Sequence, residues 1–325
     1  MKMKWTVFGL GPRTALAASF LWVMSFAFSD GGIFAGKVQS SWTALLSAWR
    51  EWSAGSEWID AGEGLLPSFF PSRDCLFFIL FSWFALEAVF WFFNGILIAL
   101  YAADAFPQYR IERRESESFD WPLFRECLAD VCIGHFLIRP LALPILYVFF
   151  QKFCVPFDDP LPSFGRVCVQ MFWCMWIDDT YFYFAHRLCH SVPWLYKNIH
   201  KQHHRFRKPV GISVEYAHPV EDIFVNTVGT VLGPLILGCH YCSFILYTLL
   251  KLWQSIEAHS NYSFPFPFSF WSFVESFDCA RAHDFHHSHN VGNFGGTTMF
   301  WDWLLGTDAA YNKWQRKKLN TNKML

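Results

Sequence analysis

Histidines are concentrated in three short stretches of this 325-residue chain, HRLCH, HKQHH and HDFHH. The last two share the spacing HxxHH. The clusters contain eight of the thirteen histidines in all: His186, His190, His200, His203, His204, His283, His286 and His287. A neutral imidazole offers one nitrogen lone pair to a transition metal while a neighbouring acceptor holds its other nitrogen. Eight such side chains exceed the four ligands of a zinc ion, so the clusters predict a site for two metal ions.

The spacing within the clusters is that of one helical face. Residues three or four positions apart on a helix are neighbours, so each cluster predicts a helical segment presenting a convergent pair or trio of imidazoles. Asp179 precedes His186 by seven positions and His190 by eleven, which places it on the same face. We expect its carboxylate to accept an imidazole N–H of the site. Isolated histidines such as His135 and His240 are expected to be buried and satisfied by hydrogen bonds.

The composition indicates a membrane protein that does not bind nucleic acid. Hydrophobic residues make up 53% of the chain and charged residues 16%, whereas an ordinary soluble domain has about 25% charged residues. A net charge of −1 provides no basic surface for nucleic acid. The ten cysteines show no paired CxxC motifs, so we interpret them as reduced rather than as a disulfide framework or a zinc site.

The N-terminal part of the chain divides into two regions. Residues 1–73 form a variable segment without clear period, in which the apolar stretch 14–29 predicts a membrane anchor. A shallow interfacial helix and the apolar core of a signal peptide are its alternatives. Residues 74–127 contain the most apolar stretch, followed by a charged linker. That stretch predicts one tilted membrane helix, or a hairpin turning near Asn94 and Gly95.

Residues 128–311 would form the catalytic domain, and residues 312–325 a basic tail. Prolines and Arg139 in an apolar stretch predict a kinked, partly buried helix ending near residue 153. The stretch 164–177 leads into the first histidine cluster, and further apolar helices are expected over 223–237 and 241–256. The predicted fold is all-α and polytopic, with about four to five membrane-inserted helices and a cap of histidine clusters holding the dimetal site.

Basic residues near the clusters predict the side of the membrane on which they lie. Lys197, Lys201 and Arg205 belong to the second cluster region, and the C-terminal tail carries Lys313 and Arg316. Short basic segments beside membrane spans remain cytoplasmic. The site and the C-terminus are therefore expected to face the cytosol.

Ligand type alone does not choose the metal, because imidazole suits zinc, copper, iron and nickel. A site at the ends of apolar helices suits a substrate dissolved in lipid, and iron with dioxygen can oxidise its unactivated C–H bonds. Hydrolysis by zinc is the competing use, but the sequence lacks an HExxH helix with its glutamate base. Gly9 and Gly11 lack the rest of a dinucleotide fingerprint, so electrons would come from a partner.

The three clusters, in this order, resemble the histidine boxes of the fatty acid hydroxylase and sterol desaturase superfamily of membrane di-iron oxygenases. The resemblance covers residues 130–311. Within that superfamily the sequence is most similar to the 4-methylsterol oxidase group. The stretches that carry this similarity are IHKQHHRFRKPVGISVEYAHPVED (199–222), EAHSNYSFPF (257–266), AHDFHH (282–287) and GNFGGTTMFWDWLLGTD (292–308).

The resemblance implies oxidation of a 4-methyl group of a sterol precursor, with two iron ions and O₂; the same imidazoles would also hold zinc in purified protein. The eight cluster histidines would be metal ligands. His259, in AHSNY, would complete the set, and His218, in EYAHP, would be either a ligand or a support. Electrons would pass from NAD(P)H through a b-type cytochrome and its reductase in the endoplasmic reticulum membrane, where other sterol-demethylation enzymes are expected partners.

Two other functions use the same features. A relative acting on fatty acyl chains, sphingoid lipids or another sterol carbon would share the boxes, and the EYAHP and AHSNYSFP stretches argue against it. A non-enzymatic metal-handling membrane protein would place ionisable ligands through the bilayer midplane, whereas these clusters lie at helix ends.

Overall fold

The computed structural model describes residues 35–54, 72–111, 119–265, 269 and 279–322. Within these ranges the chain forms helices joined by turns, and the only β-type pairing is two isolated bridges. The all-helical fold class is confirmed. The anchor predicted over residues 14–29 lies outside the described residues.

The longest helix, α4 (Arg73–Ala102), begins at Ser72, whose hydroxyl caps it by accepting the N–H of Cys75 at 3.1 Å. Its 30 residues extend about 45 Å, which exceeds the apolar thickness of a bilayer. The hairpin alternative is wrong, because the helix continues through Asn94 and Gly95. The Asn94 side chain donates instead to the carbonyl four residues earlier in the same helix, at 2.9 Å.

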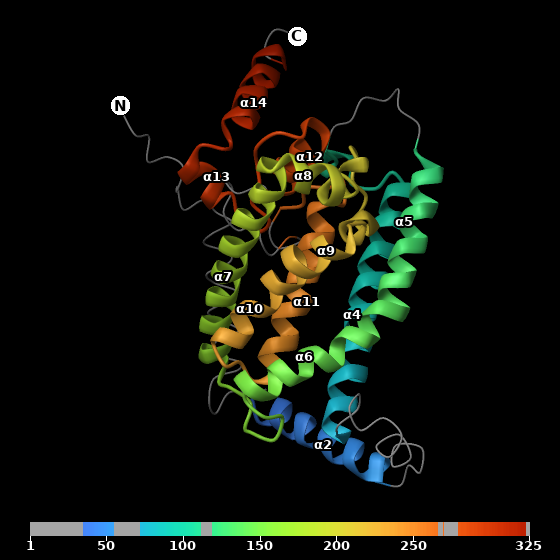
Figure 1. The fold of residues 1–325 in the computed structure, drawn as a ribbon, viewed down its shortest axis with the longest axis vertical. Coiled ribbons are helices and arrows are strands. Elements are labelled where there is room, and N and C mark those ends of the chain that lie inside the picture. Colours follow the sequence, from blue (N-terminus) through green and yellow to red (C-terminus); the bar gives the residue numbers. More distant parts are fainter. Residues whose placement is uncertain (1–34, 55–71, 112–118, 266–268, 270–278, 323–325) are drawn as a thin grey trace.

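A second long helical segment bends in its middle. It consists of α5 (Trp121–Ile133), the π-helical turn η3 (Gly134–Ile138) and α6 (Arg139–Phe153). Figure 1 shows α5 running beside α4 and α6 turning across the lower part of the bundle. The widened π turn and Pro144 inside α6 are sufficient causes of the bend. The predicted kinked helix is confirmed.

Three further helices complete the bundle: α7 (Phe164–Ser191), α10 (Val228–Ile236) and α11 (Tyr241–Ala258). α7 runs without interruption into the first histidine cluster, as predicted. α10 packs against α7, and α11 packs against α4 (Figure 1). The Tyr241 hydroxyl of α11 lies 2.8 Å from the Ser82 hydroxyl of α4 within a core of aromatic side chains.

Helix α2 (Ala35–Ala54) crosses the lower end of the bundle (Figure 1). The sequence between residues 31 and 73 shows no clear period, and no regular element was expected there. The indole N–H of Trp42 donates to the carbonyl of Phe157 at 3.1 Å, and its ring meets Phe77 edge-on. Helix α2 therefore has tertiary contacts to stabilise it, although its sequence shows only a weak helical periodicity.

The upper end of the bundle is a cap of short segments. They are η2 (Pro107–Tyr109), α8 (Pro193–Leu195), η4 (Tyr196–His200), η5 (His203–Arg205), η6 (Gly211–Glu215), α9 (Pro219–Glu221), η7 (Asp222–Thr227), α12 (Cys279–His289), α13 (Phe300–Leu305) and α14 (Ala309–Asn322). Figure 1 places α12, α8 and α9 over the ends of α7 and α11.

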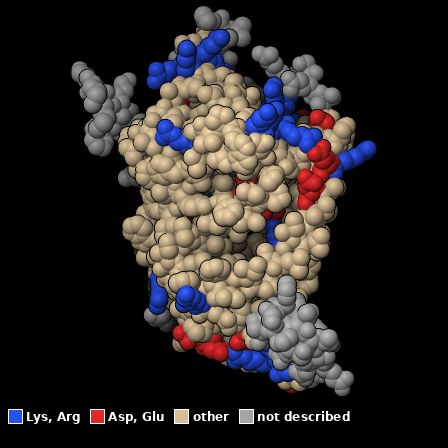
Figure 2. All heavy atoms as spheres, viewed as in Figure 1, with Lys and Arg blue, Asp and Glu red and all other residues tan. Residues whose placement is uncertain are grey.

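Two helical segments among the described residues are long and apolar enough to cross a membrane, Arg73–Ala102 and Trp121–Phe153. Figure 2 shows Lys, Arg, Asp and Glu gathered mainly toward the two ends of the visible face, with a largely uncharged band between them. Large apolar side chains such as Phe92 and Ile145 are 64% exposed. A surface of this kind suits lipid, and the full number of inserted helices stays a prediction.

Candidate metal centre

The histidine clusters meet in the cap and form two adjoining groups of inward-facing imidazoles. Centre A contains His186, His190, His200, His204 and His286. Centre B contains His203, His259, His283 and His287. Within each centre the candidate ligand atoms all lie within 4.8 Å of one another. The centres share a wall, because the rings of His204 and His287 stack with centroids 4.8 Å apart.

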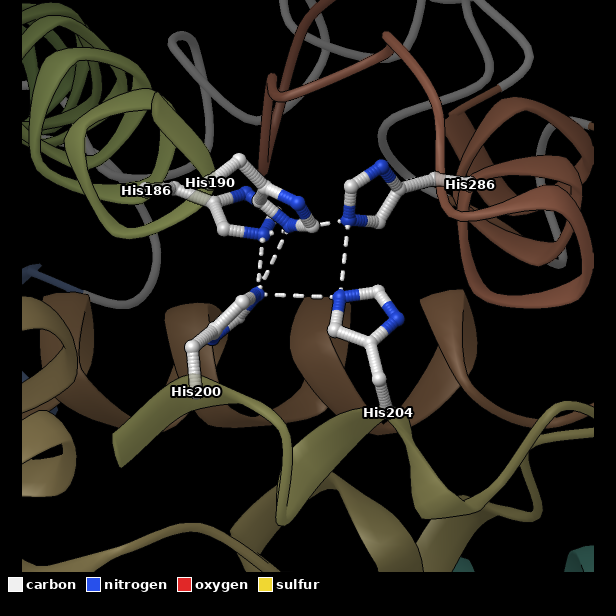
Figure 3. A group of neighbouring side chains, drawn as sticks. All are labelled: His186, His190, His200, His204 and His286. Carbon is white, nitrogen blue, oxygen red and sulfur yellow. Dashed lines mark hydrogen bonds between the residues drawn. The ribbon is translucent and has the colours of Figure 1, made fainter. Parts of the chain in front are cut away.

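In centre A the Nε2 atoms of all five rings face a common point (Figure 3). His200 Nε2 lies 3.1 Å from that of His186, 2.8 Å from that of His190 and 2.9 Å from that of His204. His286 Nε2 lies 3.1 Å from those of His186 and His204. Nitrogen ligands about 2.1 Å from one ion and at right angles to each other would be about 3 Å apart. The spacing therefore fits imidazoles around a single metal ion.

Centre B has the same arrangement with four rings. His259 Nε2 lies 3.3 Å from His203 Nε2 and 3.0 Å from His283 Nε2, and His287 Nε2 lies 3.1 Å from His283 Nε2. The four side chains come from η5, from the end of α11 and from α12. The described residues thus provide two nitrogen-rich sites, which fits the predicted pair of ions.

Oxygen acceptors fix the outer nitrogen of most of these rings. In centre A, Nδ1 of His186 and of His286 donates to a backbone carbonyl, at 2.9 and 2.5 Å. In centre B, Nδ1 of His203, His259 and His287 does the same, at 3.3, 2.8 and 3.0 Å. A neutral ring protonated at Nδ1 carries a lone pair on Nε2. Lone pairs converging at about 3 Å repel one another unless a cation lies between them, which is the chemical argument for metal.

The surroundings keep these imidazoles neutral. Burial lowers the pKa of His203 to about 4, and it holds the pKa of His286 and His287 well below the usual value, aided by the neighbouring rings. Neutral imidazole is the form that binds a metal. At neutral pH the rings would not require deprotonation before they accept an ion.

The three clusters contribute differently to the two centres. His186 and His190 both enter centre A from the end of α7, so the predicted convergence is confirmed for the first cluster. Each of the other two also presents a convergent pair, His200 with His204 in centre A and His283 with His287 in centre B. Neither forms a convergent trio, because His203 and His286 enter the opposite centre. Adjacent residues on a helical backbone are about 100° apart, so an HH pair diverges. The second cluster also lies on a π turn followed by a 3₁₀ turn, rather than on a regular helix.

Asp179 is fully buried, but its partner is not the predicted imidazole. Its Oδ1 accepts the backbone N–H groups of Thr297 and Thr298 at 2.9 and 3.0 Å, and its Oδ2 accepts the Thr298 hydroxyl at 2.5 Å. These bonds hold the loop 292–298, whose carbonyls at Gly292 and Phe294 accept from centre A. Asp179 therefore supports the site one step further out than predicted.

The carboxylate that does contact a cluster histidine is Glu221, which sequence reasoning missed. Its Oε1 accepts Nδ1–H of His200 at 2.6 Å, and its side chain is 4% exposed. The available signal was its position in EYAHPVED, one of the stretches that carry the resemblance. His218 in the same stretch belongs to neither centre. Its Nδ1 accepts the N–H of Val220 and caps α9.

The amino-acid sequence of the chain is similar to those of known proteins. Residues 171–307 match the fatty acid hydroxylase family. Methylsterol monooxygenase 2-2 of Arabidopsis thaliana is 34% identical over 198 residues, covering 60% of this chain and 73% of the relative. Methylsterol monooxygenase 1 of Rattus norvegicus is 35% identical over 217 residues, covering 65% and 70%. A very-long-chain aldehyde decarbonylase of Oryza sativa subsp. indica is 31% identical over 265 residues, covering 79% and 94%. No solved structure matches the chain.

Proposed function

The chain belongs to the methylsterol monooxygenase family, and on this premise we propose that it is a membrane di-iron oxygenase that oxidises a 4-methyl group of sterol precursors. Its family makes it an oxygen-dependent oxidoreductase. The observation that carries the proposal is the pair of adjoining centres, in which nine neutral imidazoles turn Nε2 inward.

The residues of the cap would hold and orient the metal pair. His186, His190, His200, His204 and His286 would bind one ion, and His203, His259, His283 and His287 the other. Iron held there would supply the oxidising power that an unactivated C–H bond requires. Carbonyl acceptors fix the ring orientations, and the nearly complete burial of His200 and His286 excludes bulk water from the ligands. His218 is not included in this ligand set.

A membrane setting accounts for how a sterol would reach the site. The apolar middle band and the two membrane-length segments support insertion beneath the cap. Exposed basic residues at the cap, such as Lys197, Lys201 and Arg207, support a cytosolic orientation in the endoplasmic reticulum membrane. They also offer a surface for an acidic electron-donor protein, such as a b-type cytochrome served by an NAD(P)H-dependent reductase.

A sterol and fatty-acid profile of cells lacking the protein tests the proposed substrate. We expect 4-methyl and 4,4-dimethyl sterols to accumulate, and the intact chain to restore the profile. His203→Ala should not restore it, whereas His289→Ala should, because His289 is exposed on α12 and outside both centres. Full rescue by His203→Ala with metal still bound would contradict the ligand assignment.

A second candidate function rests on the similarity to the rice aldehyde decarbonylase, which spans more of this chain than the two methylsterol monooxygenases. Long-chain aldehydes, or other acyl and sphingoid lipids, would then be the substrates of the same centres. An unchanged sterol pool with altered long-chain aldehydes, alkanes or hydroxylated lipids would favour this class. Purified protein supplied with a 4-methylsterol and a long-chain aldehyde in parallel would decide between them.

A further inference from the structure

A group of four charged side chains lies outside both centres, where α4, η3, α6 and η6 meet. It consists of Glu87, His135, Arg139 and Glu215, here called the charged tetrad. His135 is fully buried, with Nδ1 2.8 Å from an oxygen of Glu87 and Nε2 2.5 Å from an oxygen of Glu215. The Arg139 guanidinium donates to both carboxylates, at 2.8 and 2.7 Å. The sequence prediction of a buried, hydrogen-bonded His135 is confirmed.

The tetrad is balanced in charge. Each nitrogen of His135 faces a carboxylate oxygen, and an imidazole that donates at both nitrogens is the cationic form. With His135 in that form, two cations face two anions within the tetrad, and Asp222 lies close enough to interact with Arg139 and Glu215. Desolvation makes such a group costly, and apolar residues of similar volume are often equally stable in its place. Stability alone therefore does not account for the tetrad, whereas fixing the position of a chain segment does.

The segment that the tetrad holds leads directly to centre B. Glu215 is followed by Tyr216, whose carbonyl accepts Nδ1–H of His203 at 3.3 Å. The Tyr216 hydroxyl is anchored on the other side, donating at 2.7 Å to Glu126 of α5. Glu126 also accepts from Arg205, two residues after His203, at 2.7 Å. The peptide that orients His203 is thus held from both sides.

We propose that the charged tetrad positions His203 for metal binding, by fixing the Tyr216 carbonyl that holds its Nδ1–H. The inference rests on the proposed two-metal centre and adds a positioning function for residues remote from it. Among the described residues the tetrad makes no hydrogen bond to a ring of centre A, where His186, His200 and His286 are held by loop 292–298 and Glu221. Loss of the tetrad should therefore weaken one metal site and spare the other.

Anaerobic titration of the purified, metal-free full-length chain with Fe²⁺ tests this selectivity. The unaltered chain should take two ions. Glu215→Gln should weaken one of them by about 10–100-fold, the range found when partners of metal-binding histidines are removed. Asp158→Asn is the matched control, because Asp158 is exposed and pairs with Arg50 of α2, the helix at the lower end of the bundle (Figure 1). It should leave both affinities unchanged.

Variants that disable one centre identify the affected site. With centre B disabled by His287→Ala, the added Glu215→Gln should leave the remaining affinity unchanged. With centre A disabled by His286→Ala, it should produce the whole effect. Tyr216→Phe removes the second anchor without touching the tetrad and should weaken the same ion, so the inference stays testable if Glu215→Gln fails to fold.

Two results would overturn the inference alone: unaltered Fe²⁺ affinities in both Glu215→Gln and Tyr216→Phe, or equal weakening of both sites. A wild-type chain that binds no iron would overturn the proposed metal centre and this inference with it. Activity measurements are not needed for any of these outcomes.

Discussion

Glu221 allows a quantitative test of centre A. Replacing Glu221 by Leu leaves the Nδ1–H of His200 buried without an acceptor, since the carboxylate oxygen 2.6 Å away is its partner. An unsatisfied buried donor costs about 1–3 kcal/mol. A tenfold change in a binding constant corresponds to about 1.4 kcal/mol, so this cost, borne by the metal-bound state in which His200 must be oriented, lowers the metal affinity roughly 5–150-fold. Glu221→Gln keeps an oxygen that can accept the same N–H, and should lose less than tenfold.

Anaerobic Fe²⁺ titration against a competing chelator would measure both variants. Asp104→Asn serves as the control, because Asp104 is exposed and its ion-pair partner is Arg110 rather than a cluster histidine. An iron affinity of Glu221→Leu equal to that of the unaltered chain would refute the orienting function of Glu221. Equal losses in the Leu and Gln variants would refute the reasoning from the acceptor, and would indicate that the negative charge itself matters.

Two further predictions concern the loop and the protonation of the rings. Gly292 has a φ of +60°, and a Cβ there would lie 2.1 Å from the carbonyl oxygen of Thr307. Gly292→Ala should therefore destabilise the fold by about 1–3 kcal/mol, which lowers the thermal unfolding temperature, and it should weaken iron binding at centre A. Gly36→Ala is the control and should have neither effect, because a Cβ at Gly36 meets open space. In the metal-free chain the pKa of His203 is lowered from 6.5 to about 4, so the unfolded state binds a proton that the folded state does not between these values. The free energy of unfolding, measured by chemical denaturation, should therefore fall as the pH drops from 6.5 to 4, by about 1.4 kcal/mol per pH unit for each histidine whose pKa is lowered in this way. A free energy of unfolding that does not change with pH in this range would contradict the conclusion that these histidines are neutral in the folded chain.

The cluster histidines could be picked out from the sequence as candidate ligands because their spacing is local, whereas His259 was indicated only by the resemblance. The first cluster converges since HxxxH on a regular helix puts both rings on one face, and α7 supplies that helix. The long apolar stretch and the kink before Phe153 were predictable for the same reason, since each depends on nearby residues. The hairpin near Asn94 was wrong because an Asn-Gly pair is compatible with a helix when Asn94 can bond to the preceding turn.

The supporting residues could not be predicted, because they depend on contacts between distant segments. Helical periodicity placed Asp179 on the correct face but could not show that residues 297 and 298 would reach it first. Glu221 meets His200 across 21 residues, through two irregular helical turns whose direction no simple period gives. The helix α2 is a similar case, because Trp42 packs on residues far along the chain.

The division of HxxHH between two centres explains why so much of the site is held by backbone. The adjacent rings of an HH pair enter different centres, so side chains on a single helix face cannot hold both of them in place. For His203, His286 and His287 the acceptor is a backbone carbonyl outside the cluster, and a carbonyl can be supplied by any residue type. For His203 and His286 these carbonyls belong to Tyr216 and Gly292, within EYAHP and GNFGG. Both stretches belong to those that carry the resemblance, and each places a backbone acceptor beside a ring.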